Sequence, residues 1–559
     1  MNKVIIIGGV AGGATAAARI RRLDEDAQII IFEKGGNVSY ANCGIPYYIG
    51  GVIEAERNLI LRTPESLRER YRIDVRVKNE VIKIDSERKT VTVRDTESGR
   101  EYSESYDKLL LSPGASPVRP ELPGSDSSRI HTVRTVEDAL RIREVITEQG
   151  TKSAAVIGGG FIGLEMAENL AKAGIETTIV VRSTQLFPVM DADMAHLIHT
   201  IFRTNGVKLL FGKDTKAFKE TDNGIRLVFG ENDSLFADMA ILAIGVSPDT
   251  SLAEAAGLRL GDNGGIEVNE HMQTSDPDIY AVGDAVEINH QVTGKKTLIS
   301  LAGPANKEAR VAADNICGIS SRYAGSAASS VIRLFDRTAA LTGISEKTAR
   351  AAGINYEKLV LSPADHATYY PGAKNMTMKV IYEKGTLRIL GSQIIGFDGV
   401  DKRIDVIATA MQAGMTVTGL AELDLAYAPP YSSAKDPVNM AGFMAENIEN
   451  GMVSQFHWED LPSLQSDRDV FLLDTRTPAE YSRGHAASFV NIPVDELRDR
   501  LDEIPRDKPV YVMCQSGVRS YLACRILAQN GYRCYNFSGG YSFYKAAVLD
   551  EQTAVQKSE

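Results

Sequence analysis

The stretch Ala154–Glu165, AAVIGGGFIGLE, decides the fold. An apolar strand signal leads into glycines spaced as G-x-G-x-x-G, a helix follows, and Thr177–Val181 supplies a second strand. This order is typical of a dinucleotide-binding fold, in which glycines let the backbone approach a pyrophosphate at the helix N-terminus. We therefore predict that Gly158, Gly160 and Gly163 bind a nucleotide.

A similar unit opens the sequence. The apolar strand Val4–Ile7 precedes a glycine turn at 8–13, an alanine-rich helix runs to Arg22, and the strand Gln28–Phe32 ends at an acidic residue suited to ribose hydroxyls. The turn departs from the strict motif, because Val10 replaces its second glycine. The cofactor-binding residues predicted here are Gly8, Gly12, Gly13 and Glu33.

A third element completes the pattern. Ile279–Asp284, IYAVGD, is a strand ending in Gly-Asp, where a carboxylate can meet a ribityl hydroxyl. Leu109–Ala115 and its near-echo Ile241–Gly245 are expected to be strands that close the two folds at their crossover points. Gly114, Gly283 and Asp284 join the predicted cofactor-binding residues. Two such folds in one chain indicate two bound dinucleotides.

The bulk composition narrows the function class. With 559 residues we expect three or four domains, and a net charge of -11 argues against a general nucleic-acid binder. No stretch approaches the length of a membrane span, and the beginning lacks the order of a signal peptide, so a cytosolic protein is expected. Five scattered cysteines without a CxxC pair, and histidines without ligand spacing, predict neither a disulfide framework nor a metal site.

These three motifs in this order resemble the two-dinucleotide-fold flavoproteins, which include glutathione reductase, NADH oxidase, NADH peroxidase and coenzyme A disulfide reductase. The resemblance covers residues 1–446. It implies an FAD-binding domain (1–112 and 250–323), an NAD(P)H-binding domain (113–249) and a dimerisation domain (324–446). The fold class expected is α/β, with an α+β dimerisation domain.

Cys43, in Ser39–Pro46 (SYANCGIP), is the predicted redox thiol. Glutathione-reductase-like enzymes carry two cysteines five apart in this region, whereas this chain has Tyr48, and its next cysteine is Cys317. A lone thiol can store oxidation only as a sulfenic acid or as a mixed disulfide with an external partner. The competing interpretation is a buried structural cysteine.

The neighbouring residues separate two branches of the resemblance. NADH peroxidases place a histidine in the first glycine turn, where this chain has Ala11, whereas coenzyme A disulfide reductases share the turn GGVAGG. Arg19 and Arg22 lie three apart on one helix face and suit the phosphates of CoA, although two such arginines can also form a solvated face. The substrate-binding residues implied are Thr15, Arg19, Arg22, Ser39, Asn42 and Asn306.

The segment Ala426–Pro437, AYAPPYSSAKDP, resembles the C-terminal signature of the CoA branch. The resemblance implies that Tyr427 reaches the active site of the other subunit of a homodimer and that Lys435 contacts CoA. A second active-site tyrosine is implied at Tyr369, with Tyr370 as the alternative. A phenol beside the leaving CoA sulfur would act as a proton donor.

The choice of nicotinamide depends on the end of the second strand of the second fold. That strand ends Val181-Arg182-Ser183, without the acid that would repel a 2′-phosphate. Arg182 is therefore predicted to tolerate or favour NADPH, although it could equally point to solvent. NADH and NADPH both remain open as the reductant.

A second reactive thiol is predicted at Cys514, in Cys514–Arg519 (CQSGVR) between the strand Tyr511–Met513 and the helix Ser520–Gln529. Backbone N–H groups curled around the sulfur, with a helix N-terminus behind it, stabilise a thiolate or persulfide. The loop is one residue shorter than that of tyrosine phosphatases. With Leu473–Tyr481 upstream, the segment resembles a rhodanese domain, which implies that Arg519 binds substrate.

The expected architecture ends with a linker (447–460) and the rhodanese domain (461–550). The remaining cysteines at 317, 524 and 534 are expected in cores. We predict an NAD(P)H- and FAD-dependent reductase of CoA persulfide, polysulfide or disulfide, acting through Cys43 and coupled to a sulfurtransferase at Cys514. The alternatives are an NADH oxidase that uses a Cys43 sulfenic acid and a redox-sensing sulfur-carrier module that acts on a protein partner.

Overall fold

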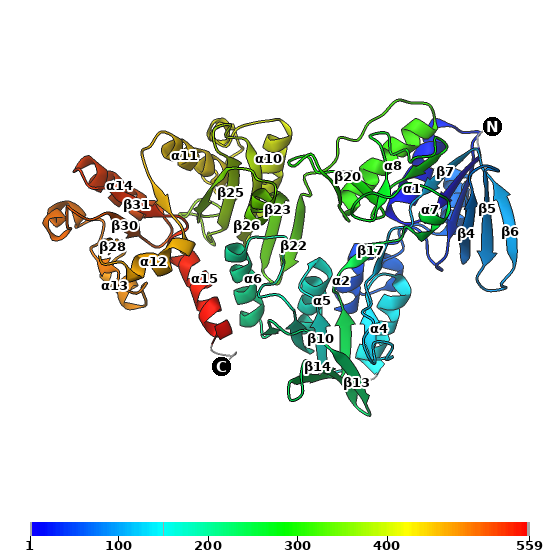
Figure 1. Cartoon of the computed structure of the whole chain (residues 1–559), viewed down its shortest axis with the longest axis horizontal. Coiled ribbons are helices and arrows are strands. Elements are labelled where there is room, and N and C mark those ends of the chain that lie inside the picture. The colour runs from blue at the N-terminus through cyan, green and yellow to red at the C-terminus, as the bar shows by residue number, and fades with distance from the viewer. Residues whose placement is uncertain (1–2, 149, 556–559) are drawn as a thin grey trace. The chain divides into compact units, whose positions relative to one another are not determined.

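The computed structural model describes residues 3–148 and 150–555, which form two compact units (Figure 1). The first comprises the described residues up to Thr184 together with Gly206–Ala328. The second comprises Gln185–Asn205 and the described residues from Ser329 onward. In the described part of the chain, no helix combines the length and apolar character needed to cross a membrane.

The first unit opens with a parallel sheet whose strands are almost continuously apolar, as expected of strands buried on both faces. The helices α1 (Ala11–Leu23) and α8 (Ala302–Ile316) pack against each other beside it. In sheet order the strands are β19 (Ile279–Ala281), β7 (Lys108–Leu111), β1 (Lys3–Ile7), β2 (Gln28–Glu33) and β3 (Asp74–Val77).

A second parallel sheet in this unit belongs to the other nucleotide fold and carries α4 (Val136–Glu148) and α5 (Phe161–Lys172). Its strands are, in order, β12 (Lys208–Leu210), β11 (Glu176–Val180), β10 (Ser153–Ile157), β16 (Met239–Leu242) and β9 (Ile130–Thr132). The predicted pair of strand–turn–helix–strand units is therefore confirmed, and the α/β fold class with it.

Smaller elements complete the first unit. Antiparallel strands β8 (Ala115–Pro117) and β17 (Val246–Pro248) pair where the chain crosses between the two folds. The other strands are β4 (Asn79–Asp85), β5 (Thr90–Asp95), β6 (Glu101–Ser105), β13 (Ala217–Thr221), β14 (Gly224–Val228), β15 (Ser234–Ala237), β18 (Ile266–Glu267), β20 (Val286–Asn289) and β21 (Lys296–Leu298). The short helices are η1 (Asn42–Gly44), α2 (Ile45–Ile49), η2 (Glu56–Asn58), α3 (Pro64–Tyr71) and α7 (Ser251–Ala255).

The second unit begins with an antiparallel sheet that packs against helices, and α6 (Ala192–Thr204) belongs to this unit. In order the strands are β22 (Ser330–Leu334), β23 (Arg337–Gly343), β26 (Ile389–Gly396), β25 (Thr377–Glu383) and β24 (Tyr356–Leu361). The helices are α9 (Glu346–Ala351), α10 (Val400–Gln412), η3 (Thr418–Glu422) and α11 (Pro437–Glu449).

A parallel sheet follows, in the order β27 (Gln455–Phe456), β31 (Cys534–Phe537), β30 (Val510–Met513), β28 (Phe471–Asp474) and β29 (Val490–Asn491). Its helices are η4 (Trp458–Asp460), α12 (Leu461–Ser466), α13 (Pro478–Ser482), η5 (Leu497–Asp499), η6 (Leu501–Glu503), α14 (Val518–Gln529) and α15 (Gly540–Val555). Part of the predicted linker 447–460 thus contributes β27 to this sheet.

The C-terminal sheet domain covers the outer edge of β24. The Val360 N–H donates a hydrogen bond to Ser538 Oγ at 2.9 Å, and Gln455 Nε2 donates to the Lys358 carbonyl oxygen at 3.2 Å. Lys358 also forms an ion pair with Glu459 at 2.6 Å. Backbone groups that an edge strand leaves open therefore find partners in the neighbouring domain.

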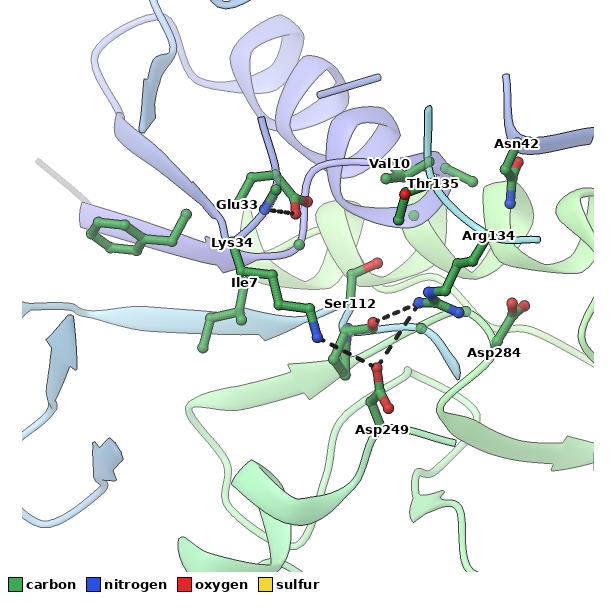
Figure 2. A pocket seen from close by; sticks show the side chains of 18 of the residues that line it. Ile7, Val10, Glu33, Lys34, Asn42, Ser112, Arg134, Thr135, Asp249 and Asp284 are labelled. Atoms are coloured by element: carbon green, nitrogen blue, oxygen red, sulfur yellow. Dashed lines mark hydrogen bonds and ion pairs between the residues drawn. The ribbon is translucent and has the colours of Figure 1, made fainter. Parts of the chain in front are cut away.

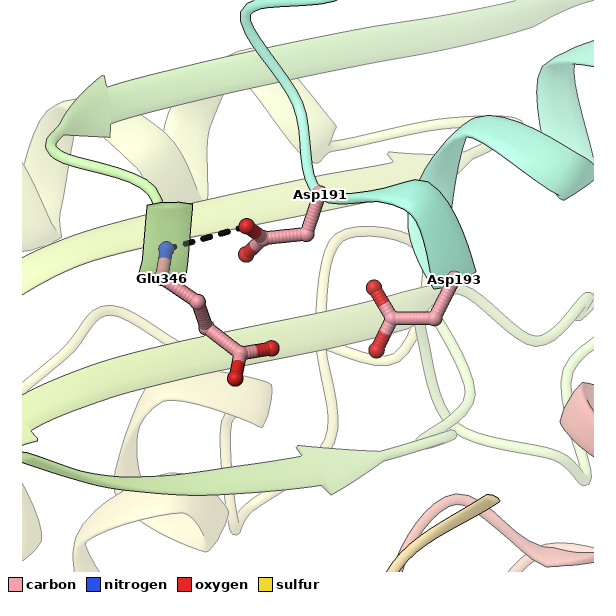
Figure 3. A group of neighbouring side chains, drawn as sticks. All are labelled: Asp191, Asp193 and Glu346. Atoms are coloured by element: carbon pink, nitrogen blue, oxygen red, sulfur yellow. Dashed lines mark hydrogen bonds between the residues drawn. The ribbon is translucent and has the colours of Figure 1, made fainter. Parts of the chain in front are cut away.

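A buried ion network holds α6 to the antiparallel sheet. Figure 3 shows three carboxylates, those of Asp191, Asp193 and Glu346, that converge on one point. The fully buried Lys379 ammonium pairs with them at 3.1, 2.8 and 2.5 Å respectively. Burial opposes ionisation of Glu346, but Lys379 and Lys358 lower its pKa to about 2. The cluster therefore binds a lysine of the chain itself.

Candidate active sites

A cavity of about 310 Å³ lies at the C-terminal ends of the first sheet's strands (Figure 2). Its wall includes the first glycine turn, Glu33, Asn42, Gly114 and the loop that carries Gly283 and Asp284. Ligands of open α/β sheets bind at this position. The structure thus gathers most of the residues predicted for the first nucleotide around one cavity.

Several positions of the first glycine turn have no room for a side chain. Gly8 has φ +92°, and a Cβ there would lie 2.1 Å from the Ser112 carbonyl oxygen. A Cβ on Gly13 would lie 1.9 Å from the Gly8 carbonyl oxygen. A Cβ on Gly12 would crowd the Ser112 hydroxyl at 2.7 Å. Val10, in contrast, fits the cavity wall, which explains why the second glycine of the strict motif can be absent.

The N-terminus of α1 suits an anion. Its N-cap residue Val10 makes no side-chain capping hydrogen bond, and its first turn carries no acid. The first N–H groups and the helix dipole therefore face the cavity side without a competing carboxylate, which suits the pyrophosphate of FAD.

Two carboxylates of the cavity match the polar groups of FAD. Glu33 accepts hydrogen bonds from the Gly9 N–H at 3.0 Å and the Gly35 N–H at 2.9 Å, which fix its orientation at the end of β2. Burial raises the pKa of Asp284, while Arg134 opposes that shift. Glu308, which the sequence did not reveal, accepts the Gly283 N–H at 2.7 Å, and burial raises its pKa to about 7.

Two cations of the cavity were also missed by the sequence analysis. Lys34 and Arg134 each approach the Asp249 carboxylate at 3.9 Å (Figure 2). Gly114, with φ +76°, leaves room for Arg134, whose Nη2 would lie 2.7 Å from a Cβ at that position. Neither cation belongs to a glycine motif, so only the folded chain identifies them.

The second glycine turn has the same design. A Cβ on Gly158 would lie 2.1 Å from the Ala243 carbonyl oxygen, and one on Gly163 would lie 2.2 Å from the Gly158 carbonyl oxygen. Gly160, the N-cap of α5, has nothing within 4 Å of its Cβ direction, so the space there is open for a nucleotide. Arg182 is exposed just beyond β11 and interacts electrostatically with Asp214.

Cys43 is an exposed free cysteine in η1, and its sulfur lies 3.9 Å from Asn42 Oδ1. Partial burial of the sulfur raises the pKa of the Cys43 thiol. The negative charges of Glu165 and Asp284 raise it further, by smaller amounts. Because Asp284 lines the cavity and Glu165 lies on α5, the thiol lies within electrostatic reach of both nucleotide folds. Burial and, to a smaller extent, the negative charge of Glu168 raise the pKa of Glu165 to about 7.

The thiol loop is anchored to the first glycine turn. Ser39 has φ +48°, a conformation rare outside glycine, and its N–H donates to the Gly9 carbonyl oxygen at 2.8 Å. Tyr48, at the position of the second cysteine of two-thiol relatives, is buried beneath the Arg143 guanidinium, 4.4 Å from its ring centre. An aromatic ring therefore fills the place of an internal partner thiol.

Of the predicted CoA-binding residues on α1, two are paired within the protein and one is exposed. Thr15 Oγ1 donates to Asn306 Oδ1 at 2.6 Å, which joins two of them across α1 and α8. Arg19 pairs with Asp314 at 2.7 Å, so its charge is neutralised within the protein. Arg22 is exposed.

The predicted tyrosines meet in the second unit. Tyr369 and Tyr427 are 74% and 46% exposed, and their hydroxyl oxygens lie 2.5 Å apart. The hydrogen bond to Tyr369 raises the pKa of Tyr427. Tyr370 instead makes an edge contact with the ring of His366, with centroids 5.8 Å apart. Lys435 is exposed just before α11.

Cys514 follows β30 and is fully buried in its loop. Its sulfur accepts hydrogen bonds from the Gly517 N–H at 3.1 Å and from Ser520 Oγ at 3.2 Å. Gly517, the N-cap of α14, has φ +98°, so this turn favours glycine. The sequence did not reveal Ser520, because a serine in the first turn of a helix has no motif of its own.

Two arginines flank this loop. Arg519 forms a bidentate pair with Glu480, with both N···O distances 2.7 Å, and this pairing lowers the pKa of Glu480 to about 2. Arg476 is buried against Asp474 at 2.7 Å and lies over the Tyr541 ring at 3.8 Å. Arg519, predicted to bind substrate, is thus held at the loop by an acid from the upstream signature.

Two nucleotide folds and one unpartnered thiol define a nucleotide-dependent thiol oxidoreductase, and the Cys514 loop defines a second, rhodanese-type centre. The comparisons with known families agree: residues 2–309 match pyridine nucleotide-disulphide oxidoreductases, 330–437 match their dimerisation domain, and 457–547 match the rhodanese-like domain. The chain belongs to the pyridine nucleotide-disulphide oxidoreductase family. The resemblance inferred from the motifs is confirmed, and the family implies FAD and NAD(P)H as cofactors.

Similar proteins cover between 80% and 98% of the chain. A reduced Bacillus anthracis CoADR-RHD structure is 46% identical, with a TM-score of 0.95 and coverage of 98% of both chains. A NAD-dependent persulfide reductase from A. fulgidus is 39% identical, with a TM-score of 0.92 and coverage of 97% of this chain and 99% of that one. The coenzyme A disulfide reductase of Staphylococcus epidermidis is 37% identical, over 80% of this chain and all of its own length.

Proposed function

We propose that this oxidoreductase uses NAD(P)H to reduce persulfides, polysulfides or the disulfide of coenzyme A at Cys43, and that its rhodanese-like domain carries sulfane sulfur on Cys514. The observation that carries the proposal is the solitary Cys43, exposed beside a cavity suited to FAD, with Tyr48 filling the place of a second thiol. A thiol without an internal partner needs a sulfur-bearing partner from outside the protein.

Similar proteins with named activities support this substrate class. Two relatives that align over 99% or more of their own length are described as a coenzyme A disulfide reductase and a NAD-dependent persulfide reductase. A water-forming NADH oxidase from Lactobacillus brevis is 28% identical, with a TM-score of 0.77, and covers 81% of this chain and 100% of its own. The two structural neighbours at 97% coverage or more are therefore better guides than the oxidase.

The CoA carrier is supported by the arrangement around the thiol. The hydrogen-bonded pair Thr15–Asn306 and the exposed Arg22 offer polar and cationic contacts along α1. Arg22 is available to a phosphate, whereas Arg19 would have to leave Asp314 to do the same. Asn42 Oδ1 accepts a hydrogen bond from the Cys43 N–H, and the Ser39 N–H donates to the Gly9 carbonyl oxygen, so both residues help to hold the backbone of the thiol loop.

The chemistry divides into two balanced steps. The Cys43 thiolate attacks the CoA-bearing sulfur of CoA persulfide, an S–S bond forms between Cys43 and CoA, and hydrosulfide leaves. FAD, held by cavity residues that include Glu33 and Asp284, would supply at this disulfide the two electrons that derive from NAD(P)H. Cys43 then returns to the thiolate and CoA leaves as its thiol, so the substrate takes up two electrons and two protons and gives CoA thiol and hydrogen sulfide.

The tyrosine pair would assist the release of CoA. In a homodimer, which the matched dimerisation domain supports, Tyr427 of one subunit would complete the site of its partner. Its hydroxyl, already hydrogen-bonded to Tyr369, could pass a proton to the leaving sulfur. Tyr369, rather than Tyr370, is the second tyrosine that this contact supports.

The rhodanese-like centre would hold a persulfide anion. The Gly517 N–H and the Ser520 hydroxyl donate to the Cys514 sulfur, and the α14 N-terminus lies directly behind the loop. Such donors stabilise negative charge on sulfur. Arg519 contributes positive charge at the loop, balanced by Glu480.

The test compares substrates and thiols under anaerobic conditions. NADH and NADPH consumption is measured with CoA persulfide and with CoA disulfide for the natural protein, Cys43→Ser, Cys514→Ser and the control Cys317→Ser. We expect Cys43→Ser to fall to background on both substrates and Cys317→Ser to match the natural protein. Full turnover by Cys43→Ser would exclude the mechanism.

The same variants test the second centre. Thiosulfate:cyanide sulfurtransferase activity should be lost in Cys514→Ser and kept in Cys43→Ser, and activity that survives in Cys514→Ser would exclude the assignment. A mass spectrum of the purified protein should show CoA attached to Cys43. Rapid NADH consumption in air without any sulfur substrate would favour the oxidase instead.

The nicotinamide preference is tested at one residue. Arg182 lies exposed after β11, where a 2′-phosphate could meet it. Arg182→Ala should raise KM for NADPH more than KM for NADH. Equal changes in both KM values would mean that Arg182 does not contact the 2′-phosphate.

A further inference from the structure

The rhodanese-like domain holds a second pair of thiols besides Cys514. Cys524 lies on α14 and is buried, whereas Cys534 begins β31 and is partly exposed. Helix and strand pack against each other, and the Cys534 sulfur lies 3.2 Å from the Cys524 carbonyl oxygen. Each thiol also shifts the pKa of the other, so the two side chains lie within interaction range. The pair is therefore a neighbouring dithiol between two elements distant in sequence.

The two thiols differ in reactivity. The hydrogen bond from Cys524, then the Ala528 N–H and the Arg525 cation, lower the pKa of Cys534 against the effect of its burial. The hydrogen bond to Cys534, burial, and the negative fields of Cys534 and Cys514 raise the pKa of Cys524. The accessible sulfur is thus the more readily ionised of the two.

We propose that Cys524 and Cys534 form a second sulfur-reactive site, at which a small inorganic polysulfide oxidises the dithiol to a disulfide. An accessible thiolate next to a second thiol is the arrangement found at redox-reactive cysteine sites. This site goes beyond the function proposed for Cys43 and Cys514, and it needs neither the flavin cavity nor coenzyme A.

The reaction balances with hydrogen disulfide, HS–SH, as the oxidant. The Cys534 thiolate attacks one sulfur of hydrogen disulfide, the S–S bond of that molecule breaks, Cys534 becomes a persulfide, and hydrosulfide leaves. Cys524 then attacks Sγ of Cys534, a disulfide forms between the two residues, and the outer sulfur leaves as hydrogen sulfide with the proton of Cys524. Two thiols are oxidised to one disulfide while hydrogen disulfide is reduced to two molecules of hydrogen sulfide.

Geometry assigns the order of attack. Cys534 is the member that solvent reaches, and Cys524 faces it from within the core that also contains Leu527 and Val512. A polysulfide anion would have to cross this apolar core to reach Cys524 first. The inner thiol is therefore the resolving one.

The test uses the full chain, reduced and then treated with disodium disulfide without oxygen. After alkylation and proteolysis, mass spectrometry should find peptides of Cys524 and Cys534 joined by a reducible bond, two hydrogens lighter than the separate thiols. Without the disulfide reagent, the linked pair should be absent. Both cysteines found fully alkylated, at a dose that converts Cys514 to a persulfide, would overturn the proposal.

Variants test the order of attack. Cys524→Ser should trap Cys534 one sulfur heavier, whereas Cys534→Ser should leave Cys524 unmodified. A persulfide on Cys524 in Cys534→Ser would contradict the assignment. Cys43→Ser serves as the matched control and should form the linked pair like the natural protein, whatever happens to NAD(P)H turnover. Because the linked pair is sought first in the natural protein, a folding defect in either serine variant does not weaken the test.

Discussion

Lys379 illustrates how a single buried charge depends on its partners. Its ammonium is fully buried and is surrounded by the carboxylates of Asp191, Asp193 and Glu346. Lys379 is the cation that all three carboxylates share, and its removal would leave buried negative charge with too little compensation, which is costly. The same residue joins α6 to the antiparallel sheet.

Lys379→Met should therefore lower the free energy of unfolding by about 3–5 kcal/mol. Urea unfolding followed by far-UV circular dichroism measures this change. Lys384→Met is the matched control, since Lys384 pairs with Glu357 at the surface and is 49% exposed. A loss in Lys379→Met no larger than in the control would mean that the network contributes no net stability.

Glu480 should make the stability of the folded protein depend on pH. Its pKa is about 2 in the folded protein, chiefly because Arg519 hydrogen-bonds its carboxylate, whereas an unfolded glutamate has a pKa of about 4.3. A lowered folded pKa stabilises the folded state above about pH 4.3, and this contribution is lost as pH falls towards about 2.

The stability difference between the natural protein and Glu480→Gln should consequently be constant from about pH 5 to 7 and shrink as pH falls below about 4.3. Denaturant unfolding at several pH values measures it. Glu496→Gln is a suitable control, because Glu496 pairs with Arg500 at an exposed position. A difference that grows on acidification would contradict the pairing.

At the scale of elements, two glycines of the second glycine turn have different roles, one in packing and one in ligand binding. Gly163 has no room for a methyl group, because the Gly158 carbonyl oxygen would lie 2.2 Å away. Gly160 has open space in the same direction and an ordinary φ of −83°. Glycine is needed at position 163 so that the helix can pack closely on the strand. At position 160 it leaves space for a nucleotide to approach the helix N-terminus.

Gly160→Ala should fold with an unchanged melting temperature and raise KM for NAD(P)H by about tenfold, equal to about 1.4 kcal/mol. Gly163→Ala should lower the melting temperature itself. Differential scanning calorimetry and steady-state kinetics together distinguish the two effects. An unchanged KM in Gly160→Ala would show that the nucleotide does not occupy the space beside this residue.

The elements also show what a sequence can and cannot predict. The strands β1 and β2 each differ by one residue from the predicted ranges Val4–Ile7 and Gln28–Phe32, because apolar runs beside a glycine turn mark buried parallel strands clearly. The helix α14 starts two residues earlier than expected, at the positive-φ Gly517.

Whether a site residue could be predicted from the sequence depends on whether it belongs to a local motif. Glycines and cysteines in local motifs were found, because their spacing alone carries the signal. Arg134 and Glu308 were missed because they reach the cavity from segments distant in sequence, and Ser520 was missed because it lies just outside the loop motif, in the first turn of α14. No local pattern distinguishes such residues from ordinary surface or core positions.

At the scale of the whole molecule, the proposed homodimer predicts shared active sites. Cys43 belongs to the first unit and Tyr427 to the second, and the resemblance implies that they meet across the dimer. A subunit carrying Cys43→Ser still offers an intact Tyr427, and a subunit carrying Tyr427→Phe still offers an intact Cys43.

Mixing the Cys43→Ser and Tyr427→Phe variants under conditions that allow subunit exchange should therefore add up to about a quarter of the natural activity, from the one complete site in each hybrid dimer. Activity with CoA persulfide before and after exchange measures this. No recovery, despite hybrids detected by native mass spectrometry, would place Tyr427 in the site of its own subunit.

The covered edge of β24 has a consequence for how the chain can be divided. Its outward Val360 N–H and Lys358 carbonyl are satisfied by Ser538 and Gln455, so the sheet ends against another domain rather than in water. Cutting the chain before Gln455 would strip that cover from a buried, largely apolar strand. The shortened protein would then present an open template for β-pairing, and its chief weakness would be aggregation rather than lost catalysis.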